Sequence, residues 1–277
     1  MTQILVKANG AVIPALGFGT WSLKGEDAAR GVEAALRCGY RHVDTAIMYE
    51  NEEAVGEGLR ASGVARGEVF VTTKVPPALI GEKDFLTAAE GSVKRLGLSQ
   101  VDLLLIHWPN PEHDLAGTMR ALNKAKTSGL TKHIGISNFP TKLLDQAWAL
   151  TSEPLVTNQC EYHPLLDQSK LIAAMRARGM AFTSYSPVGR GRLFGMAPVV
   201  AAAKAHGKTE SQIILRWHVQ QPGVIAIPRS SNAGRIAENL DIFDFALSDA
   251  EMTAISALAR PDGRMVQPAW APEWDAA

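Results

Sequence analysis

Short apolar runs alternate with amphipathic segments along most of the chain. The first run, 16–18, precedes residues 26–38, where Ala28, Val32, Ala35 and Leu36 recur at helical spacing until Gly39 ends the helix. Further runs of strand length lie at 42–43, 69–72, 101–106, 133–136, 155–157, 181–184 and 224–227. Helical segments separate them at 52–59, 83–96, 115–126, 142–150, 169–178, 198–206 and 210–221. Eight strand–helix units predict an α/β fold, the (β/α)8 TIM barrel.

A β-hairpin is predicted before the repeating units. Residues 4–6 and 12–13 are short β-prone runs around Asn9-Gly10, the strongest short hairpin signal because both residues tolerate a positive φ. We expect this hairpin to cap one end of the barrel, and extra helices to follow near the C-terminus. No linker or low-complexity segment interrupts the chain, so residues 1–277 are predicted to form one domain.

An open, doubly wound sheet is the main alternative architecture. Its phosphate-binding loop needs G-x-G-x-x-G directly after the first strand. The corresponding stretch, Gly17-Phe-Gly19-Thr-Trp-Ser22, lacks the third glycine. The sequence therefore disfavours this fold.

Composition and charge limit the partners of the protein. Hydrophobic residues make up 46% of the chain and charged residues 20%, which favours a substantial core. Lys plus Arg and Asp plus Glu number 28 each, so the net charge gives no pull toward nucleic acid or an anionic membrane. Cys38 and Cys160 are too few for a disulfide scaffold. Without a signal peptide, a membrane span or a heptad pattern, we expect a cytoplasmic monomer with no nucleic-acid or membrane partner.

Four polar residues lie just past predicted strands. Asp44 follows the run 41–43 and Tyr49 lies in the next loop, while Lys74 closes 69–74 and His107 closes 101–107. The C-terminal strand ends of a barrel converge on one mouth, so we expect these side chains to meet there. Taken singly, each has a simpler explanation: a turn cap for Asp44, aromatic surface for Tyr49, a solvated strand end for Lys74 and a core histidine for His107.

These residue types suit proton transfer to a carbonyl oxygen. A phenol has an unperturbed pKa near 10, so Tyr49 is protonated at neutral pH and can act as an acid. The ammonium of Lys74 stabilises its anion, Asp44 orients Lys74, and His107 orients the carbonyl oxygen. No nucleophile is paired with a base, which disfavours acyl transfer. The carbonyl carbon then needs a hydride, and hence a cofactor.

The segment 227–239, after the eighth predicted strand, is a candidate phosphate site. Arg229 and Arg235 flank a helix start for which three residues are suitable N-caps: Ser230, Ser231 and Asn232. Free N–H groups at a helix start bind anions, and barrels commonly hold phosphate in the loops after their last strands. A capped, solvated helix with surface arginines is the simpler alternative.

Two further motifs are less specific. The glycine-rich stretch Pro187-Val-Gly-Arg-Gly-Arg-Leu-Phe-Gly195 is either a wrap around a pyrophosphate or a flexible loop. Cys160 and His163 have metal-like spacing, but no second Cys/His pair follows, so no metal site is predicted.

Together these motifs resemble the aldo-keto reductase superfamily. The resemblance rests on Gly39-Tyr-Arg-His-Val-Asp-Thr-Ala46 with Tyr49 at the family's catalytic spacing, Asp102-Leu-Leu-Leu-Ile-His-Trp-Pro109, Ile134-Gly-Ile-Ser-Asn-Phe139, Asn158-Gln-Cys-Glu-Tyr-His-Pro164 and the segment 227–239. It covers essentially the whole chain, and it is closest to the short prokaryotic branch that includes the diketogluconate reductases.

The resemblance implies NADPH-dependent reduction of aldehydes and ketones by a catalytic tetrad of Asp44, Tyr49, Lys74 and His107. It also implies the residues that bind the cofactor. The nicotinamide is expected to contact Thr20, Trp21, Asp44, Ser137, Asn138, Gln159 and Tyr185, and the pyrophosphate to contact Ser186, Val188 and their neighbours. The 2′-phosphate is expected to bind Arg229, Ser230, Ser231 and Arg235, and the adenine to contact Glu238 and Asn239.

The chain departs from the family pattern in two places. Arg229 stands where the family more often has lysine, so a planar fork replaces a point charge. The tail after Arg260 is short, so steroid-type specificity is not implied.

The substrate is expected to be a small-molecule carbonyl compound whose identity stays open. The residues expected to line an apolar substrate pocket are Trp21, Tyr49, His107, Trp108 and Trp270, whereas ordinary packing is the expectation for Trp274. Two other functions remain as alternatives: a nicotinamide-binding regulatory subunit with incidental turnover, and a barrel enzyme of unrelated chemistry such as an isomerase.

Overall fold

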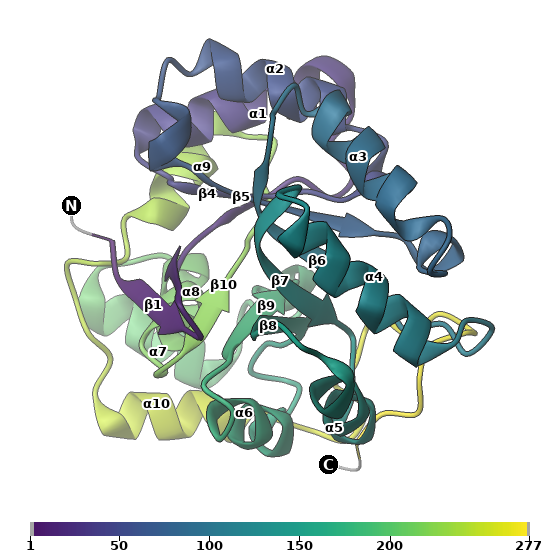
Figure 1. Ribbon diagram of the computed structural model, residues 1–277. Helices are drawn as coiled ribbons and strands as arrows, with labels where there is room; N and C mark the ends of the chain where they lie inside the picture. The colour runs from purple at the N-terminus through teal and green to yellow at the C-terminus, as the bar shows by residue number, and fades with distance from the viewer. Residues whose placement is uncertain (1–2, 276–277) are drawn as a thin grey trace.

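In the computed structural model, which describes residues 3–275, eight parallel strands form one closed sheet (Figure 1). The strands are β3 (Phe18–Gly19), β4 (His42–Asp44), β5 (Phe70–Val75), β6 (Val101–Ile106), β7 (Thr131–Ser137), β8 (Leu155–Glu161), β9 (Ala181–Tyr185) and β10 (Val224–Ala226). They pair in chain order from β3 to β10. The barrel closes where the Gly17 N–H donates to the Ala226 carbonyl over 2.8 Å and the Gly19 N–H to the Pro228 carbonyl over 2.9 Å. The predicted (β/α)8 barrel is confirmed.

Helices surround the sheet. They are α1 (Gly25–Cys38), α2 (Glu52–Ala61), α3 (Phe85–Arg95), α4 (Leu115–Thr127), α5 (Thr141–Leu150), α6 (Ser169–Arg176), α7 (Ala197–His206), α8 (Glu210–Val219), α9 (Ala233–Leu240) and α10 (Asp249–Ser256). Helix α1 buries the apolar positions that predicted it, and Gly39 ends it with a φ of 121°. The extra helices expected near the C-terminus are present as α9 and α10. The position of α10 was not predicted, although Ser248 and Glu251 form a capping box at its start.

The predicted hairpin closes the N-terminal end of the barrel. Its strands β1 (Leu5–Ala8) and β2 (Ala11–Pro14) pair antiparallel around Asn9 and Gly10, whose φ values are 43° and 89°. The Asn9 side-chain amide donates to the carbonyls of Leu155 and Arg178 over 2.7 and 3.0 Å. Leu155 begins β8, so the hairpin lies at the end of the barrel opposite the carboxyl ends of the strands.

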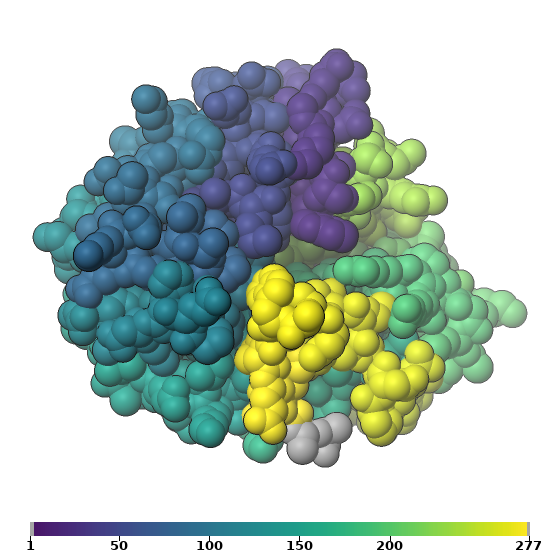
Figure 2. Space-filling view, turned by 90° about the vertical axis from the view of Figure 1, so that its right-hand side faces the viewer, coloured from purple at the N-terminus to yellow at the C-terminus, as the bar shows by residue number. Residues whose placement is uncertain are grey.

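The segment after α10 crosses the barrel on the other side. Figure 2 shows it in yellow, lying between the blue and teal part of the chain and the green part. No helix within the described residues is both long and apolar enough to cross a membrane.

Helices α1 and α2 approach closely at Gly58. A methyl group there would lie 2.4 Å from the Ala29 carbonyl oxygen and 2.8 Å from the Val32 Cβ. Alanine favours a helix over glycine by about 1 kcal/mol, but overpacking a tight contact costs about 1–3 kcal/mol. We therefore expect Gly58→Ala to lower the free energy of unfolding by up to about 2 kcal/mol, measured by urea denaturation. Gly67→Ala is the matched control, because a methyl group at Gly67 meets no atom within 4 Å. An equal effect of both substitutions would contradict the expected close contact.

Candidate active site

The carboxyl ends of neighbouring strands bring the four predicted residues together. Asp44 is the last residue of β4, Lys74 lies one residue before the end of β5, and His107 follows β6 directly. Tyr49 ends the short 3-10 helix Ile47–Tyr49, after β4. Asp44, Tyr49 and His107 line a cavity of about 680 Å³. Lys74 lies beneath its wall, with a fully buried side chain.

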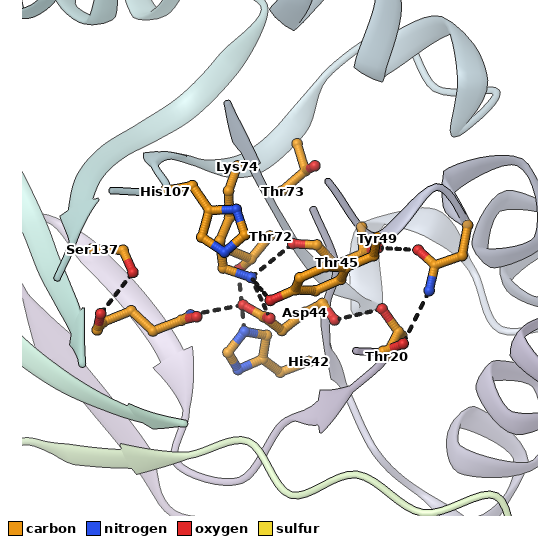
Figure 3. A network of polar contacts seen from close by, with 12 residues as sticks. Thr20, His42, Asp44, Thr45, Tyr49, Thr72, Thr73, Lys74, His107 and Ser137 are labelled. Carbon is orange, nitrogen blue, oxygen red and sulfur yellow. Dashed lines mark hydrogen bonds and ion pairs between the residues drawn. The ribbon is translucent and has the colours of Figure 1, made fainter. Parts of the chain in front are cut away.

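The Lys74 ammonium is the centre of the polar network in Figure 3. It lies 2.6 Å from Asp44 Oδ1 and donates to the Thr45 carbonyl over 2.8 Å and to the Tyr49 hydroxyl over 3.2 Å. Burial alone lowers the pKa of Lys74, but the nearby Asp44 and Tyr49 outweigh that effect, so its pKa is raised. Lys74 is therefore a fixed positive charge at neutral pH.

Tyr49 is held as a protonated phenol. Burial raises its pKa, and the charge of Lys74 opposes this increase only in part. Lys74 nevertheless stabilises the anion that would form on loss of the proton. The His107 ring meets the Tyr49 ring edge-on, with the centroids 5.5 Å apart. The phenol thus lies between an ammonium and an imidazole.

His107 is a neutral imidazole. Burial, and then the charge of Lys74, hold its pKa well below the usual value. Its Nδ1 makes no hydrogen bond with any residue in 3–275, and its carbonyl accepts from the Asn138 side-chain amide over 3.0 Å. A neutral imidazole can donate a hydrogen bond to an oxygen without adding a net charge.

The second oxygen of Asp44 links the network to β8. Gln159 Nε2 donates to Asp44 Oδ2 over 2.8 Å, and the Ser137 hydroxyl donates to the Gln159 carbonyl over 2.7 Å. The Thr20 N–H and hydroxyl both donate to the Asp44 carbonyl over 3.0 Å. Thr20 and Ser137 are fully buried and support the wall without lining the cavity.

Two buried residues after Tyr49 were not singled out from the sequence. The Asn51 amide donates to the carbonyls of Thr20 and Leu23 over 2.9 Å each. Glu52 accepts from the Thr73 hydroxyl over 2.6 Å and from Arg95 Nη2 at 2.7 Å. Both side chains fasten the Tyr49 loop to neighbouring segments. Their proximity to Tyr49 in the chain was the only sequence signal.

The cavity wall includes many residues that the sequence proposed for cofactor or substrate. Besides the tetrad members, these are Trp21, Trp108, Asn138, Gln159, Tyr185, Ser186, Val188, Arg229 and Trp270. The Tyr185 hydroxyl donates to Asn138 Oδ1 over 2.8 Å, which fixes its ring at the wall. Asn138 and Ser186 have positive φ values of 65° and 50°.

The proposed phosphate residues divide between the cavity and the start of α9. Arg229 donates from Nε to the Trp21 carbonyl over 3.2 Å, so it reaches across to the loop after β3. Asn232 is the N-cap of α9, accepting from the Arg235 N–H over 3.0 Å. Ser231 and Arg235 are exposed, and the Ser230 hydroxyl accepts from the Asn232 N–H.

The proposed adenine residues contact α8 and its N-cap, Thr209. The Thr209 hydroxyl donates to Glu238 over 2.9 Å, and the Ser211 hydroxyl donates to Asn239 Oδ1 over 3.0 Å. Neither Glu238 nor Asn239 lines the cavity.

The rest of the cavity wall was predicted less specifically or not at all. Met48 and the residues 265–268 line it, as does Arg190, whose guanidinium lies 5.4 Å from the centre of the Trp21 ring. Arg190 belongs to the glycine-rich stretch singled out in the sequence, but the tail showed no periodic pattern that would place it. Trp270 and Trp274 meet the Trp108 ring edge-on, with centroids 5.1 and 6.0 Å away. Trp274 packs here and lines no part of the cavity.

Comparison with known proteins assigns the family. The model of the Aldo/keto reductase family matches residues 15–260. The chain belongs to this family. An aldo-keto reductase of Mycobacterium sp. (strain MCS) is 43% identical over 251 residues, covering 90% of this chain and 88% of that protein.

Solved structures of aldo-keto reductases are closely similar. A putative 2,5-diketo-D-gluconic acid reductase B superimposes with a TM-score of 0.97 at 44% identity, covering 99% of this chain and 98% of that one. A Bombyx mori aldo-keto reductase in complex with NADP has a TM-score of 0.89 at 33% identity, covering 97% and 96%. The predicted family and enzyme class are therefore confirmed, as is the likeness to diketogluconate reductases.

His42 gives this aldo-keto reductase a testable pH dependence. It lies two residues before Asp44 on β4, and burial is the main cause that lowers its pKa to about 4. The unfolded chain binds a proton at His42 near pH 6.5, whereas the folded chain does not. The stability from neutral His42 is thus present above pH 6.5 and is lost as the pH falls toward 4, by up to about 3 kcal/mol. We expect the free energy of unfolding to fall more steeply over this range than in His42→Gln, measured by urea denaturation. Parallel pH profiles would contradict the assignment.

Proposed function

We propose that this aldo-keto reductase reduces an aldehyde or ketone to the alcohol with NADPH, with Tyr49 as the proton donor. One observation carries the proposal. The Tyr49 hydroxyl lies at the cavity wall, 3.2 Å from a fully buried ammonium that is itself paired with Asp44 over 2.6 Å. This arrangement suits a phenol that must give up a proton and be stabilised as its anion.

The residues of the cavity fit a nicotinamide cofactor. Gln159 lines the wall and donates to Asp44 through its nitrogen, while its Oε1 accepts no hydrogen bond from residues 3–275 and is available to a carboxamide. The fixed Tyr185 ring offers a flat face for stacking. Trp21 and Asn138 are proposed to contact the rest of the nicotinamide, with Thr20 and Ser137 supporting this site from behind the wall. Ser186 and Val188 would contact the pyrophosphate.

The region around the start of α9 fits the end of NADPH that carries the 2′-phosphate and the adenine. The residues proposed to hold the 2′-phosphate are Arg229, Ser230, Ser231 and Arg235, because guanidinium groups pair with phosphate through several hydrogen bonds. Glu238 and Asn239, later on α9, are proposed to contact the adenine. The complex of the Bombyx mori relative with NADP supports this choice of cofactor.

Each member of the tetrad has one role in the proposed reaction. When bound, NADPH would supply the hydride that the carbonyl carbon needs, and it would be left as NADP+. The Tyr49 hydroxyl transfers its proton to the carbonyl oxygen, and Lys74 stabilises the phenolate that remains. The neutral His107 ring donates a hydrogen bond to the same oxygen as negative charge develops on it. Asp44 keeps Lys74 charged and in place.

The substrate end of the cavity is largely apolar. Met48, Trp108, Val266 and Trp270 form this part of the wall. We propose that a carbonyl compound with an apolar or aromatic substituent binds here, because such a wall replaces water around apolar surface.

Tyr49→Phe tests the proton donor. This substitution keeps the ring and removes the hydroxyl, so we expect kcat for aldehyde reduction to fall by roughly 10²–10⁴-fold. Affinity for NADPH should change little, measured by fluorescence titration. Tyr162→Phe is a matched control, because the Tyr162 hydroxyl donates to Gln221 and Tyr162 is absent from the cavity wall. Turnover by Tyr49→Phe at the rate of the parent would show that the role of Tyr49 is wrong.

Arg235→Ala tests the 2′-phosphate site. Loss of one charged partner should raise the Kd of NADPH by roughly tenfold and leave the Kd of NADH unchanged, both measured by fluorescence titration. Arg176→Ala removes an exposed arginine on α6 and should alter neither value. Equal effects on NADPH and NADH would place Arg235 outside the phosphate site.

A further inference from the structure

A buried carboxylate fastens the C-terminal segment to the mouth of the barrel. Glu161 is the last residue of β8, and its side chain is fully buried. Its Oε1 accepts from the Met265 N–H over 2.8 Å, and its Oε2 accepts from the Val266 N–H over 2.9 Å. His163 Nε2 lies 3.0 Å from Oε1. Main-chain groups 104 and 105 residues away in the sequence are thus held by one side chain.

The two fastened residues form part of the cavity wall. Met265 and Val266 line the cavity together with Gln267, Pro268 and Trp270. Glu161 also lies on the same face of β8 as Gln159, because residues two apart on a strand share a face. Since Gln159 donates to Asp44, the same strand end contacts both the Asp44 carboxylate and the segment that forms this part of the wall.

The ionised state of Glu161 lets it accept both main-chain hydrogen bonds. Burial raises the pKa of a carboxyl group, but the hydrogen bonds from His163, Val266 and Met265 outweigh burial and lower the pKa of Glu161. It is therefore ionised at neutral pH. A carboxylate has only acceptor atoms, so it can receive both N–H groups at once. Loss of either acceptor leaves a buried main-chain donor unpaired.

At the same point, Arg264 Nη1 lies 4.0 Å from Glu161 Oε2. Other contacts of the segment lie on either side. Before it, Gly263 packs so tightly that a methyl group would lie 1.8 Å from the Leu165 carbonyl oxygen. After it, Asp275 accepts from the Thr141 N–H over 2.9 Å, and Trp270 packs against Trp108. Between these points, Glu161 is the polar anchor of the part that faces the cavity.

We propose that Glu161 is a positioning residue that sets which carbonyl compounds this enzyme accepts. By fixing Met265 and Val266, Glu161 holds the apolar wall in the position where a bulky, aromatic carbonyl compound contacts it. A small carbonyl compound such as glyoxal does not reach this wall, so its binding does not depend on the position of the wall. The inference rests on the proposed function, because it assigns a selectivity to the same cavity.

Glu161→Gln tests the inference with little change in shape. The amide nitrogen of glutamine would face a main-chain N–H, so one of the two bonds is lost. We expect KM for an aromatic aldehyde to rise by roughly tenfold, while kcat and the Kd of NADPH stay within about twofold. KM for glyoxal should not change. Glu153→Gln is the matched control, because Glu153 pairs with Lys126 away from the cavity.

Limited trypsin digestion of the folded protein reports on the anchor without relying on turnover. Cleavage after Arg264, the residue before Met265, should be faster in Glu161→Gln than in the parent and in Glu153→Gln. Glu161→Asp keeps the charge but shortens the side chain. If the glutamine variant does not fold, we expect the same changes in KM and in trypsin cleavage for Glu161→Asp.

The outcomes separate this inference from the proposed function. A parent protein that reduces no carbonyl compound would overturn the proposed function and, with it, the selectivity role. An active parent whose ratio of the two KM values is unchanged in the Glu161 variant would overturn the selectivity role alone. A joint loss of kcat and NADPH affinity would also overturn it, because that pattern belongs to general damage of the barrel.

Discussion

The fully buried ammonium of Lys74 constrains everything around it. A charge removed from water must be paired, and removal of one partner of a buried pair costs about 3–5 kcal/mol. Asp44, the Thr45 carbonyl and the Tyr49 hydroxyl meet this requirement together. The same contacts fix the direction in which the phenol points. Stability and the proposed chemistry therefore depend on the same few atoms.

This arrangement depends on the parallel pairing of the strands. Asp44 and Lys74 belong to β4 and β5, and His107 follows β6. The parallel pairing of these strands places all three side chains at one mouth. The Asn9 amide fastens the hairpin at the opposite end. Polar side chains at the mouth can then form the site, while the hairpin covers the apolar interior at the N-terminal end of the barrel.

The sequence predicted the barrel and the meeting of the four residues because both follow from local periodicity. The end of each strand can be predicted from the sequence, and the barrel topology determines where that end lies in the fold. The contacts that shape the rest of the cavity are of another kind. Glu161 and Met265 are 104 residues apart, and the tail carries no repeating pattern that would place it over the mouth. Arg229 looked like part of a helix start, yet its guanidinium contacts the loop after β3, a pairing that only the folded chain defines.

Closure of the sheet has a consequence for the behaviour of the protein among other molecules. The hydrogen bonds between the β3 and β10 regions leave the eight-stranded sheet, as described for residues 3–275, without a free edge. An open sheet edge presents a row of unpaired main-chain groups, which templates aggregation with another chain. In this barrel those groups are used internally, so the eight-stranded sheet offers no edge strand to which a neighbouring chain can add.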